Sequence, residues 1–364
     1  MRYWSDFSRV YYHPKSLVQL YDYELHSSVM PFERFETGGE LFNSLDKEHE
    51  IVDRDWRPFV EECDRMEGIQ VFASLDDAWG GFAAQYVEAL RDEYPKACIW
   101  TWGLQSPMLD TPRDKRQLRT ANVAQSLGSL AGHASTVVPL SVPEGKLPGN
   151  VKVDLNSTWH VSALLATAIE SATLPSRLLA QRGVGAVNLS DLAGNLNAAG
   201  NQTLAGLKFA TGVEEDDIDG KDETIDLFNV GRSKNEKPNR GSPFGKILCA
   251  RGLEEKEDEE EDDDRKRKLI GDPVIRRYKT KLSFPLLDSF PGIYSDYTTK
   301  ESIPVVSSLV TDKTVSTRMK TLRTQIGWSI GVDEREALNS TLADVGDAYE
   351  DDWSSGSDEG DDDY

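Results

Sequence analysis

The stretch from residue 63 to residue 104 decides the fold: CDRMEGIQVFASLDDAWGGFAAQYVEALRDEYPKACIWTWGL. Its pattern predicts a strand over 68–74, a tight loop over 75–81, an amphipathic helix over 82–94 and a second strand over 97–104. Apolar side chains repeat along one face of this helix, and they are Phe82, Tyr86, Val87, Leu90 and Tyr94. The result is a βαβ unit. In such units, phosphate is held at the loop after the first strand, on backbone N–H groups at the helix N-terminus.

Composition and charge describe a globular protein with acidic segments. The chain has 364 residues, of which 38% are hydrophobic, enough for one large core or two modest ones. Its net charge of −22 is localised, because 254–264 holds ten acids and one lysine and 344–364 holds ten acids and no base. The rest of the chain carries about −3. It therefore lacks the basic face that direct binding of nucleic acid requires.

The cysteines and the apolar runs bear on the compartment. Cys63, Cys98 and Cys249 form no CxxC pair, which is neither a disulfide framework nor a zinc signature and fits a reducing compartment. The five histidines lack metal-ligand spacing, so we expect no metal site. No apolar run reaches the ~18 residues of a membrane-spanning helix, and the first residues resemble neither a signal peptide nor a mitochondrial presequence. We expect the chain on the cytosolic side of membranes, free or peripherally attached.

The remaining elements follow from local patterns. We expect loops and short strands over most of 1–55, a helix within 53–66, and a polar connection over 107–119. The segment 156–174 predicts a helix that is buried on most sides, because it holds a single carboxylate, with Asn156 or Ser157 as its cap. Further predicted elements are a short helix at 120–130, an extended segment at 133–143, a helix at 190–196, a strand at 203–209 and a helix near the C-terminus over 333–348.

Charge and turn residues dominate 212–269, apart from apolar side chains near 225–230 and 247–248, so we expect most of it to be disordered. The stretch 316–328 is basic and amphipathic. It places Met319 and Leu322 on one face and Arg318 and Lys320 on the other, and the apolar face either packs in the domain or contacts a membrane or partner.

Residues 51–211 resemble the tubulin/FtsZ superfamily, and the whole chain is similar to the fungal Misato family, a divergent tubulin-like group. RYWSDFSRVYYHPKSLVQL (2–20) resembles that family's own signature. CDRMEGIQVFASL, followed by a glycine loop and a helix ending in LRDEYP, resembles the tubulin helix, strand, phosphate loop and next helix.

The resemblance implies an α/β fold with a tubulin-like, Rossmann-type sheet and a smaller α+β domain. We therefore expect a nucleotide-type domain over 1–155, a joining helix over 156–175 and a second domain over 176–211 and 270–345. An acidic disordered insert over 212–269 and a tail over 346–364 complete the division. The chain also begins downstream of the place where tubulins carry their first strand. Either the sequence is truncated or the domain lacks a central strand.

Three segments carry implied site residues. Asn122 in ANVAQSL resembles the asparagine of tubulin's YNA-type segment, which meets the nucleotide base. VSALLATAIESATLP (161–175) resembles the long helix that joins the tubulin domains. NLSDLAGNLN (188–197) resembles the loop and helix whose acid, here Asp191, tubulins offer to the nucleotide of a neighbouring subunit.

The phosphate loop departs from the family pattern. Where tubulins have GGGTGSG, residues 76–82 read DDAWGGF, so of the glycine positions only that of Gly80 is kept. Asp76 and Asp77 would repel phosphate, at about 1 kcal/mol per charge pair at ~4 Å in water and about 4 at an effective dielectric of 20. Trp79 fills space that a phosphate needs. Thr158 replaces a second asparagine at the start of the joining helix, which weakens a base contact.

Each of these residues can also have a purely structural role. Asp76 and Asp77 could hold magnesium, but capping of the next helix is the commoner role for acids in that position. Asp191 is either the counterpart of the family's catalytic acid or a helix-start residue, and Asn122 is either a nucleotide contact or a turn or cap residue. We therefore treat Asp76, Asp77, Gly80, Gly81, Asn122 and Thr158 as a vestigial nucleotide site, with no cofactor expected and GTP as the alternative.

Two functions follow as hypotheses. The resemblance implies a non-enzymatic tubulin-like protein in mitochondrial partitioning and mitochondrial DNA inheritance, located on the cytosol-facing mitochondrial surface and in the cytoplasm. Its implied partners are proteins such as tubulin, chaperonin or mitochondrial surface proteins, with no direct contact to nucleic acid. The alternative is a GTP-binding or GTP-hydrolysing protein that assembles cytoskeletal or spindle-related polymers.

Overall fold

The computed structural model describes residues 12–13, 16–18, 20, 23, 29–108, 111–145, 147–179, 186–212, 218, 223–232, 242–253, 273–297, 301–326 and 332–350. A parallel sheet of β1 (Ile69–Ser74), β2 (Ile99–Leu104) and β3 (Thr136–Leu140), in that order, organises its first half. All of β3 and nearly all of β2 are buried, as parallel strands covered on both faces require. The predicted βαβ unit is confirmed, with α3 (Ala78–Glu93) as its helix.

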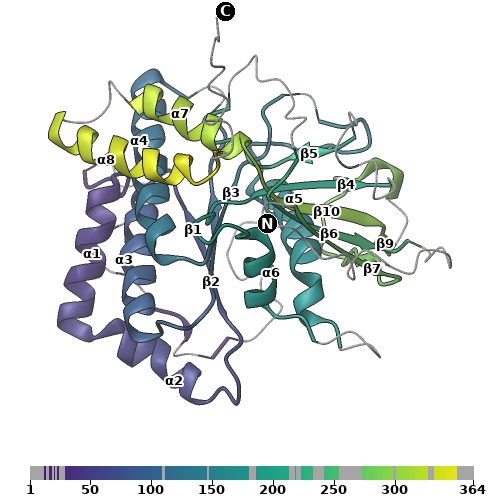
Figure 1. Ribbon diagram of the computed structural model, residues 1–364, viewed down its shortest axis with the longest axis horizontal. Helices are drawn as coiled ribbons and strands as arrows, with labels where there is room; N and C mark the ends of the chain where they lie inside the picture. Colours follow the sequence, from purple (N-terminus) through teal and green to yellow (C-terminus); the bar gives the residue numbers. More distant parts are fainter. Residues whose placement is uncertain are drawn as a thin grey trace, which may run out of the picture.

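Helices cover both faces of this sheet. α1 (Phe35–His49), α3 and α4 (Arg113–His133) lie on one side, and α5 (Thr158–Thr173) and α6 (Leu189–Leu196) on the other (Figure 1). Alternation along the strands explains the two layers, because successive side chains point to opposite faces. Ile99 and Val137 join the core of α3 and α4, whereas Trp100 and Trp102 join the core of α5 and α6.

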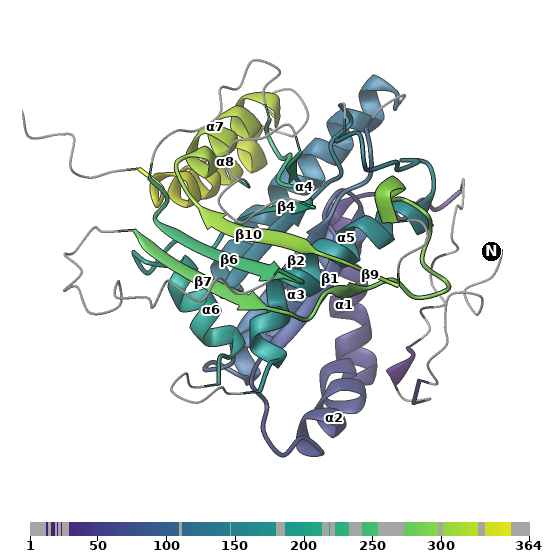
Figure 2. The ribbon, with the colours of Figure 1, turned by 90° about the vertical axis from the view of Figure 1, so that its right-hand side faces the viewer.

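A second sheet packs on the far side of α5 and α6. Its order is β5-β4-β10-β6-β7, with β10 paired antiparallel to both β4 and β6, and β6 parallel to β7. Figure 2 looks onto the side of this sheet that faces away from the first. The strands are β4 (Gly206–Thr211), β5 (Ile225–Asp226), β6 (Gly245–Arg251), β7 (Val274–Thr280) and β10 (Val305–Thr311). A short pair, β8 (Phe284–Pro285) and β9 (Ser302–Ile303), lies beside it.

The C-terminal helices return to the first sheet. α7 (Thr314–Ile326) and α8 (Val332–Asp347) pack against α4 (Figure 1), and Met319 shares a core with Leu127 of α4. Tyr349 is fully buried, and its hydroxyl accepts the N–H of Leu204 at 2.6 Å and donates to the Leu204 carbonyl at 2.8 Å. The chain is therefore held in the core as far as Tyr349, and the predicted tail boundary at 346 is wrong. The rest of that tail lies outside the described residues.

Local patterns predicted several elements correctly. α5 matches the helix expected over 156–174, and its cap is Ser157, whose hydroxyl accepts the N–H of His160. α6 matches the helix expected over 190–196, and β3 and β4 match the extended segments near 133–143 and 203–209. α8 matches the helix expected over 333–348.

Other expectations are corrected. Within the loops and short strands expected over most of 1–55, residues 35–49 instead form α1, a 15-residue helix whose glycines hide it from propensity and which is held by packing on α3. Most of 1–28 lies outside the described residues. The helix expected within 53–66 is a π-helical turn (Val52–Trp56) followed by α2 (Arg57–Glu61). The helix expected over 120–130 is the longer α4, because the polar residues before it form its exposed first turns.

Two further corrections concern charged segments. The predicted disordered insert over 212–269 contains β5 and β6, and β6 is an internal strand whose side chains Ile247, Leu248 and Cys249 are buried. On α7 the structure buries Met319 and Leu322, so of the two alternatives the apolar face packs in the domain. It also buries Arg318, only 3% exposed, which bonds Asp226 at 3.1 Å and lies over the Phe228 ring.

Candidate functional site

The loop at the carboxyl end of β1 is shorter than predicted. It consists of Leu75, Asp76 and Asp77, after which α3 begins at Ala78, so the loop expected over 75–81 is wrong in its second half. Asp77 is the N-cap residue in extended conformation, and its carboxylate accepts the N–H of Trp79 at 2.9 Å. Such a cap satisfies an otherwise orphan helix donor. Gly80 and Gly81 are thus in the first turn of a helix and not in a phosphate-binding loop.

Asp76 braces the sheet. Only 2% of it is exposed, and its carboxylate accepts hydrogen bonds from the Ser74 hydroxyl at 2.8 Å and the Ser106 N–H at 3.0 Å. The Arg119 guanidinium lies 3.8 Å away. A buried carboxylate is stable only when it is paired and hydrogen-bonded in this way. Asp76 therefore ties the ends of β1 and β2 to α4, and this role replaces the capping role expected for it.

The electrostatics of the loop disfavour an anion. Burial raises the pKa of Asp77, and the neighbouring Asp76 charge adds to that rise, against the opposing hydrogen bond from Trp79 N–H. The charged form of the Asp77 carboxylate is therefore already disfavoured beside Asp76. A phosphate bound here would add further negative charge to the same place. No cluster of three or more potential metal ligands of the His, Cys, Asp or Glu type occurs in the described part of the chain.

Asn122 is a tertiary link. It is 1% exposed on α4, and its Oδ1 accepts the N–H of Phe35 at 3.1 Å. Its Nδ2 donates to the carbonyls of Glu33 at 2.7 Å and Asp76 at 3.1 Å. Both amide protons are therefore used within the protein. Asn122 is thus more than the local turn or cap residue considered from the sequence, because it joins the start of α1 and the β1 loop to α4.

The glycines serve close packing of helices. A Cβ on Gly80 would lie 2.1 Å from the Ser126 hydroxyl, and one on Gly81 would lie 1.9 Å from the Phe35 carbonyl oxygen. On the facing helix, a Cβ on Gly38 would lie 1.7 Å from the carbonyl oxygen of Ala78. The first turns of α1 and α3 thus approach each other at a distance that only glycine allows. We call this contact between α1 and α3 the glycine junction (Gly38 and Gly81).

Aromatic side chains surround the glycine junction. The Phe42 ring meets those of Phe82 and Tyr86 edge-on at 5.5 and 5.4 Å between centroids. Trp79 is 41% exposed and meets Phe32 at 5.0 Å. The tryptophan expected to fill a phosphate position therefore lies at the surface, against the segment that leads into α1.

The other two predicted site residues lie on the second helical layer. Thr158 is exposed at the first position of α5, after the cap Ser157. Asp191 takes part in a capping box on α6, where its carboxylate accepts the N–H of Asn188 at 3.0 Å and the Asn188 side chain accepts the N–H of Asp191 at 2.9 Å. The helix-start role of Asp191 is the one that the geometry gives.

The sequence did not point to Arg119 and Phe35, which contact Asp76 and Asn122 at the carboxyl end of the first sheet. Arg119 precedes Asn122 by three positions, and residues at that spacing share a helix face. That spacing was a usable signal. Phe35 contributes only its backbone N–H, for which the sequence holds no signal.

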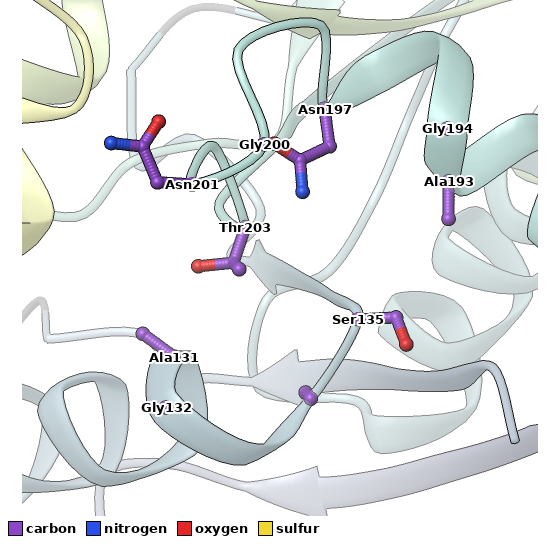
Figure 3. Close-up of a pocket in the computed structure, with 10 residues that line it drawn as sticks. Ala131, Gly132, Ser135, Ala193, Gly194, Asn197, Gly200, Asn201 and Thr203 are labelled. Carbon is purple, nitrogen blue, oxygen red and sulfur yellow. The ribbon is translucent and has the colours of Figure 1, made fainter. Parts of the chain in front are cut away.

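A cleft of about 500 Å³ opens at the opposite end of the first sheet (Figure 3). Two segments line it, from the end of α4 into β3 and from α6 into the loop after it, and Figure 3 shows Asn197 directed toward the gap between them. All lining residues are uncharged: Ala131, Gly132, Ala134, Ser135, Ala193, Gly194, Asn197, Gly200, Asn201 and Thr203. Both helices end at this cleft, with the negative ends of their dipoles there. The cleft is therefore unsuited to phosphate.

No helix within the described ranges combines the length and apolarity that crossing a membrane requires.

Comparisons with known proteins agree with this architecture. A tubulin domain family matches residues 1–178. Protein DML1 of Gibberella zeae is 48% identical over all of this chain and 75% of its own length, and Protein dml-1 of Neurospora crassa is 44% identical over all of this chain and 77% of its own. Protein dml1 of Schizosaccharomyces pombe is 31% identical over 57% of this chain and 43% of its own length.

Proposed function

The chain belongs to the DML1 family, the fungal Misato-like group of divergent tubulin-like proteins, and on that basis we propose that it works as a non-enzymatic interaction protein. We propose further that its process is mitochondrial partitioning and mitochondrial DNA inheritance, on the cytosol-facing mitochondrial surface and in the cytoplasm. Its partners in this proposal are proteins, with tubulin, chaperonin and mitochondrial surface proteins as the classes to test. The mitochondrial part rests on the resemblance to the Misato family.

One observation carries the non-enzymatic part. Asn122 uses both amide protons and its oxygen on Phe35, Glu33 and Asp76, and is buried while doing so. A nucleotide base could take these donors only after the start of α1 had separated from α4. That separation would leave buried backbone groups unpaired, each at about 1–3 kcal/mol.

The phosphate position supports the same proposal. Gly81 and Gly38 are in van der Waals contact with the opposite helix, so their N-terminal turns have no room for a phosphate between them. The adjacent carboxylates of Asp76 and Asp77 add repulsion.

Titration of the purified chain with fluorescently labelled GTP and magnesium tests this part. We expect no saturable binding at concentrations below about 1 mM, which corresponds to a binding free energy weaker than about 4 kcal/mol. The Asp77→Gly variant, which restores a tubulin-like glycine, serves as the matched control and should also fail to bind, because the glycine junction is unchanged. Micromolar binding by the natural chain would overturn the proposal.

A second candidate function is GTP binding with polymer assembly. It is favoured by the position of Asn122, whose Nδ2 lies 3.1 Å from the Asp76 carbonyl oxygen, next to the loop where the resemblance places a nucleotide. Sedimentation of the chain with and without GTP separates the two candidates. Nucleotide-dependent pelleting would favour the second.

The proposed location has its own test. Tagged protein is followed in mitochondria that are treated with protease while intact. We expect the mitochondrial fraction of the tag to be digested. Recovery of the tag in a protease-resistant matrix fraction would contradict a cytosol-facing location.

A further inference from the structure

The cleft between α4 and α6 holds carbonyl groups that no protein donor satisfies. The last turn of a helix leaves its carbonyls without intrahelical partners, and they point along the axis beyond the helix end. The carbonyls of Ala131 and Gly132 in α4 and of Gly194 in α6 accept no hydrogen bond from the described residues. All three residues line the cleft. The cleft therefore offers three free backbone acceptors.

Two side chains add donors to the same space. The Asn197 Oδ1 accepts the N–H of Gln202 at 2.7 Å, whereas the Asn197 Nδ2 donates to no described residue. Figure 3 shows this nitrogen directed toward the gap between the two walls. The Ser135 hydroxyl accepts from the N–H of Ile99 and from Arg91, both at 3.1 Å, so its own proton is free to donate. Acceptors and donors side by side match a peptide chain, in which each residue carries both.

The surroundings of the cleft favour a positive charge. Helix dipoles place partial negative charge at the ends of α4 and α6. α8 ends nearby as well, because Gln202, between the lining residues Asn201 and Thr203, donates to the Ala348 carbonyl at 3.2 Å. Asp347 is exposed in the last turn of α8, and it belongs to the run 344–364 with ten acids and no base.

Cations of the chain itself do not fill this place. No lysine or arginine is among the residues that line the cleft. Arg91 contacts Ser135, but its guanidinium also donates to the carbonyls of His133 and Ala97, each at 2.8 Å. The free carbonyls of the cleft are therefore left for a cation from outside.

We propose that the cleft binds an extended basic segment of a partner protein. A lysine or arginine side chain of the segment donates to the carbonyls of Ala131, Gly132 and Gly194, and a peptide carbonyl accepts from the Asn197 Nδ2. An ammonium has three N–H donors and a guanidinium five, so either group can serve all three acceptors. The volume of about 500 Å³ suits a few residues of such a segment, since ligand sites span roughly 300–1,000 Å³.

This inference rests on the proposed role as an interaction protein and names the chemistry of one partner. It does not depend on the nucleotide question, because the cleft and the glycine junction lie at opposite ends of the first sheet. Failure of peptide binding would therefore leave the result of the GTP titration standing, and the two proposals can fail separately.

Fluorescence titration of the full chain at low salt tests the inference, with the labelled peptide Ser-Arg-Ser-Arg-Ser as probe. We expect saturable binding with a dissociation constant below about 1 mM. Citrulline in place of both arginines removes the charge and should weaken the binding at least tenfold. Gly194→Leu should do the same, because its side chain enters open space in the cleft. Ala166→Leu, at an exposed position of α5, is the matched control and should bind like the natural chain.

Unchanged binding by Gly194→Leu would show that the acidic surface alone holds the peptide, and would overturn the inference. Equal affinity for the citrulline peptide, loss of binding in the Ala166→Leu control, or no saturable binding up to about 1 mM would overturn it too. Displacement of the peptide by an equal concentration of spermidine would show that the cleft takes a free polyamine, which also contradicts a peptide site.

Photocrosslinking of the natural chain is a second measurement that needs no variant to fold. The same peptide with a terminal benzophenone should label residues within 131–135 or 193–203. Labelling confined to 344–350 would place the peptide on the acidic end of α8 and would contradict binding in the cleft.

Discussion

At the carboxyl end of the first sheet a Cβ on Gly81 would lie 1.9 Å from the Phe35 carbonyl oxygen, whereas at the opposite end a Cβ on Gly194 would meet nothing within 4 Å. The first region is closed by helix packing and by the bonds of Asp76 and Asn122. The second is an open cleft with uncharged walls. A helical glycine at one end of the sheet therefore marks close packing of helices, and one at the other end lies beside open space. Only the surrounding contacts distinguish the two cases.

The largest effect should come from Asn122→Ala. It leaves the Phe35 N–H and the carbonyls of Glu33 and Asp76 without their partner in a buried place, and we expect a loss of about 3 kcal/mol in the free energy of unfolding. Denaturant titration measures it. Gln125→Ala, on the same helix with an exposed bond to Glu36, is the matched control and should cost less than about 0.5 kcal/mol. Equal losses of unfolding free energy for the two variants would show that the hydrogen bonds of Asn122 do not hold this region closed.

The glycine comparison itself predicts effects of opposite sign. Gly81→Ala should lower the free energy of unfolding by about 1–3 kcal/mol, since the methyl group meets backbone atoms of α1 that cannot rotate away. Gly194→Ala should raise it by up to about 1 kcal/mol, because alanine favours the helix and space is open. Both are measured by the same denaturant titration. A neutral Gly81→Ala would mean that the junction is loose enough to admit a ligand.

Hydrogen bonds from the C-terminal end of the described chain stabilise one wall of the open cleft. Tyr349 bonds Leu204, next to the cleft residue Thr203, and Gln202 donates to the Ala348 carbonyl at 3.2 Å. Tyr349→Phe should therefore cost about 1–2 kcal/mol of unfolding free energy. Hydrogen exchange should show faster opening at Leu204, while the Asp76 loop stays protected. Unchanged exchange at Leu204 would count against this link.

The smallest effect concerns Asp77. Its pKa is raised by burial, so the folded state holds the proton more tightly than the unfolded state, and its contribution to stability rises as pH falls through the raised pKa. Asp77→Asn keeps the cap and removes the charge. At neutral pH we expect a change within a few tenths of a kcal/mol, in the stabilising direction, that vanishes in acid. Unfolding at several pH values compares the two proteins, and a clear loss of stability at neutral pH would show that the charge is favoured.

The parts of the fold that the sequence predicts are those set by neighbours in the chain. The βαβ unit, α5 with its cap and α6 follow from periodicity and capping residues. α1 was missed because Gly38 and Gly39 read as a turn, and its helix depends on contact with α3, some 40 residues away. β6 was missed because its short apolar run lies in an acidic neighbourhood and gains its place from β10.

The site divides in the same way. The capping role of Asp77 and the helix-start role of Asp191 are local and were foreseen as alternatives. Asp76 and Asn122 take their roles from partners far along the chain, such as Ser106 and Phe35, and no spacing rule reaches that far. The prediction of a degenerate phosphate loop rested on residue types, whereas the physical reason for closure lies in tertiary contacts.

The thermal unfolding midpoint of the natural chain, with and without GTP and magnesium, tests the central claim most directly, namely that the carboxyl end of the first sheet is closed to nucleotide. At about 1 mM ligand, a micromolar site would stabilise the folded state by about 4 kcal/mol and raise the midpoint by several degrees. We predict no shift. A rise of that size, absent with ATP, would contradict the account and show that α1 and Asn122 yield to the nucleotide.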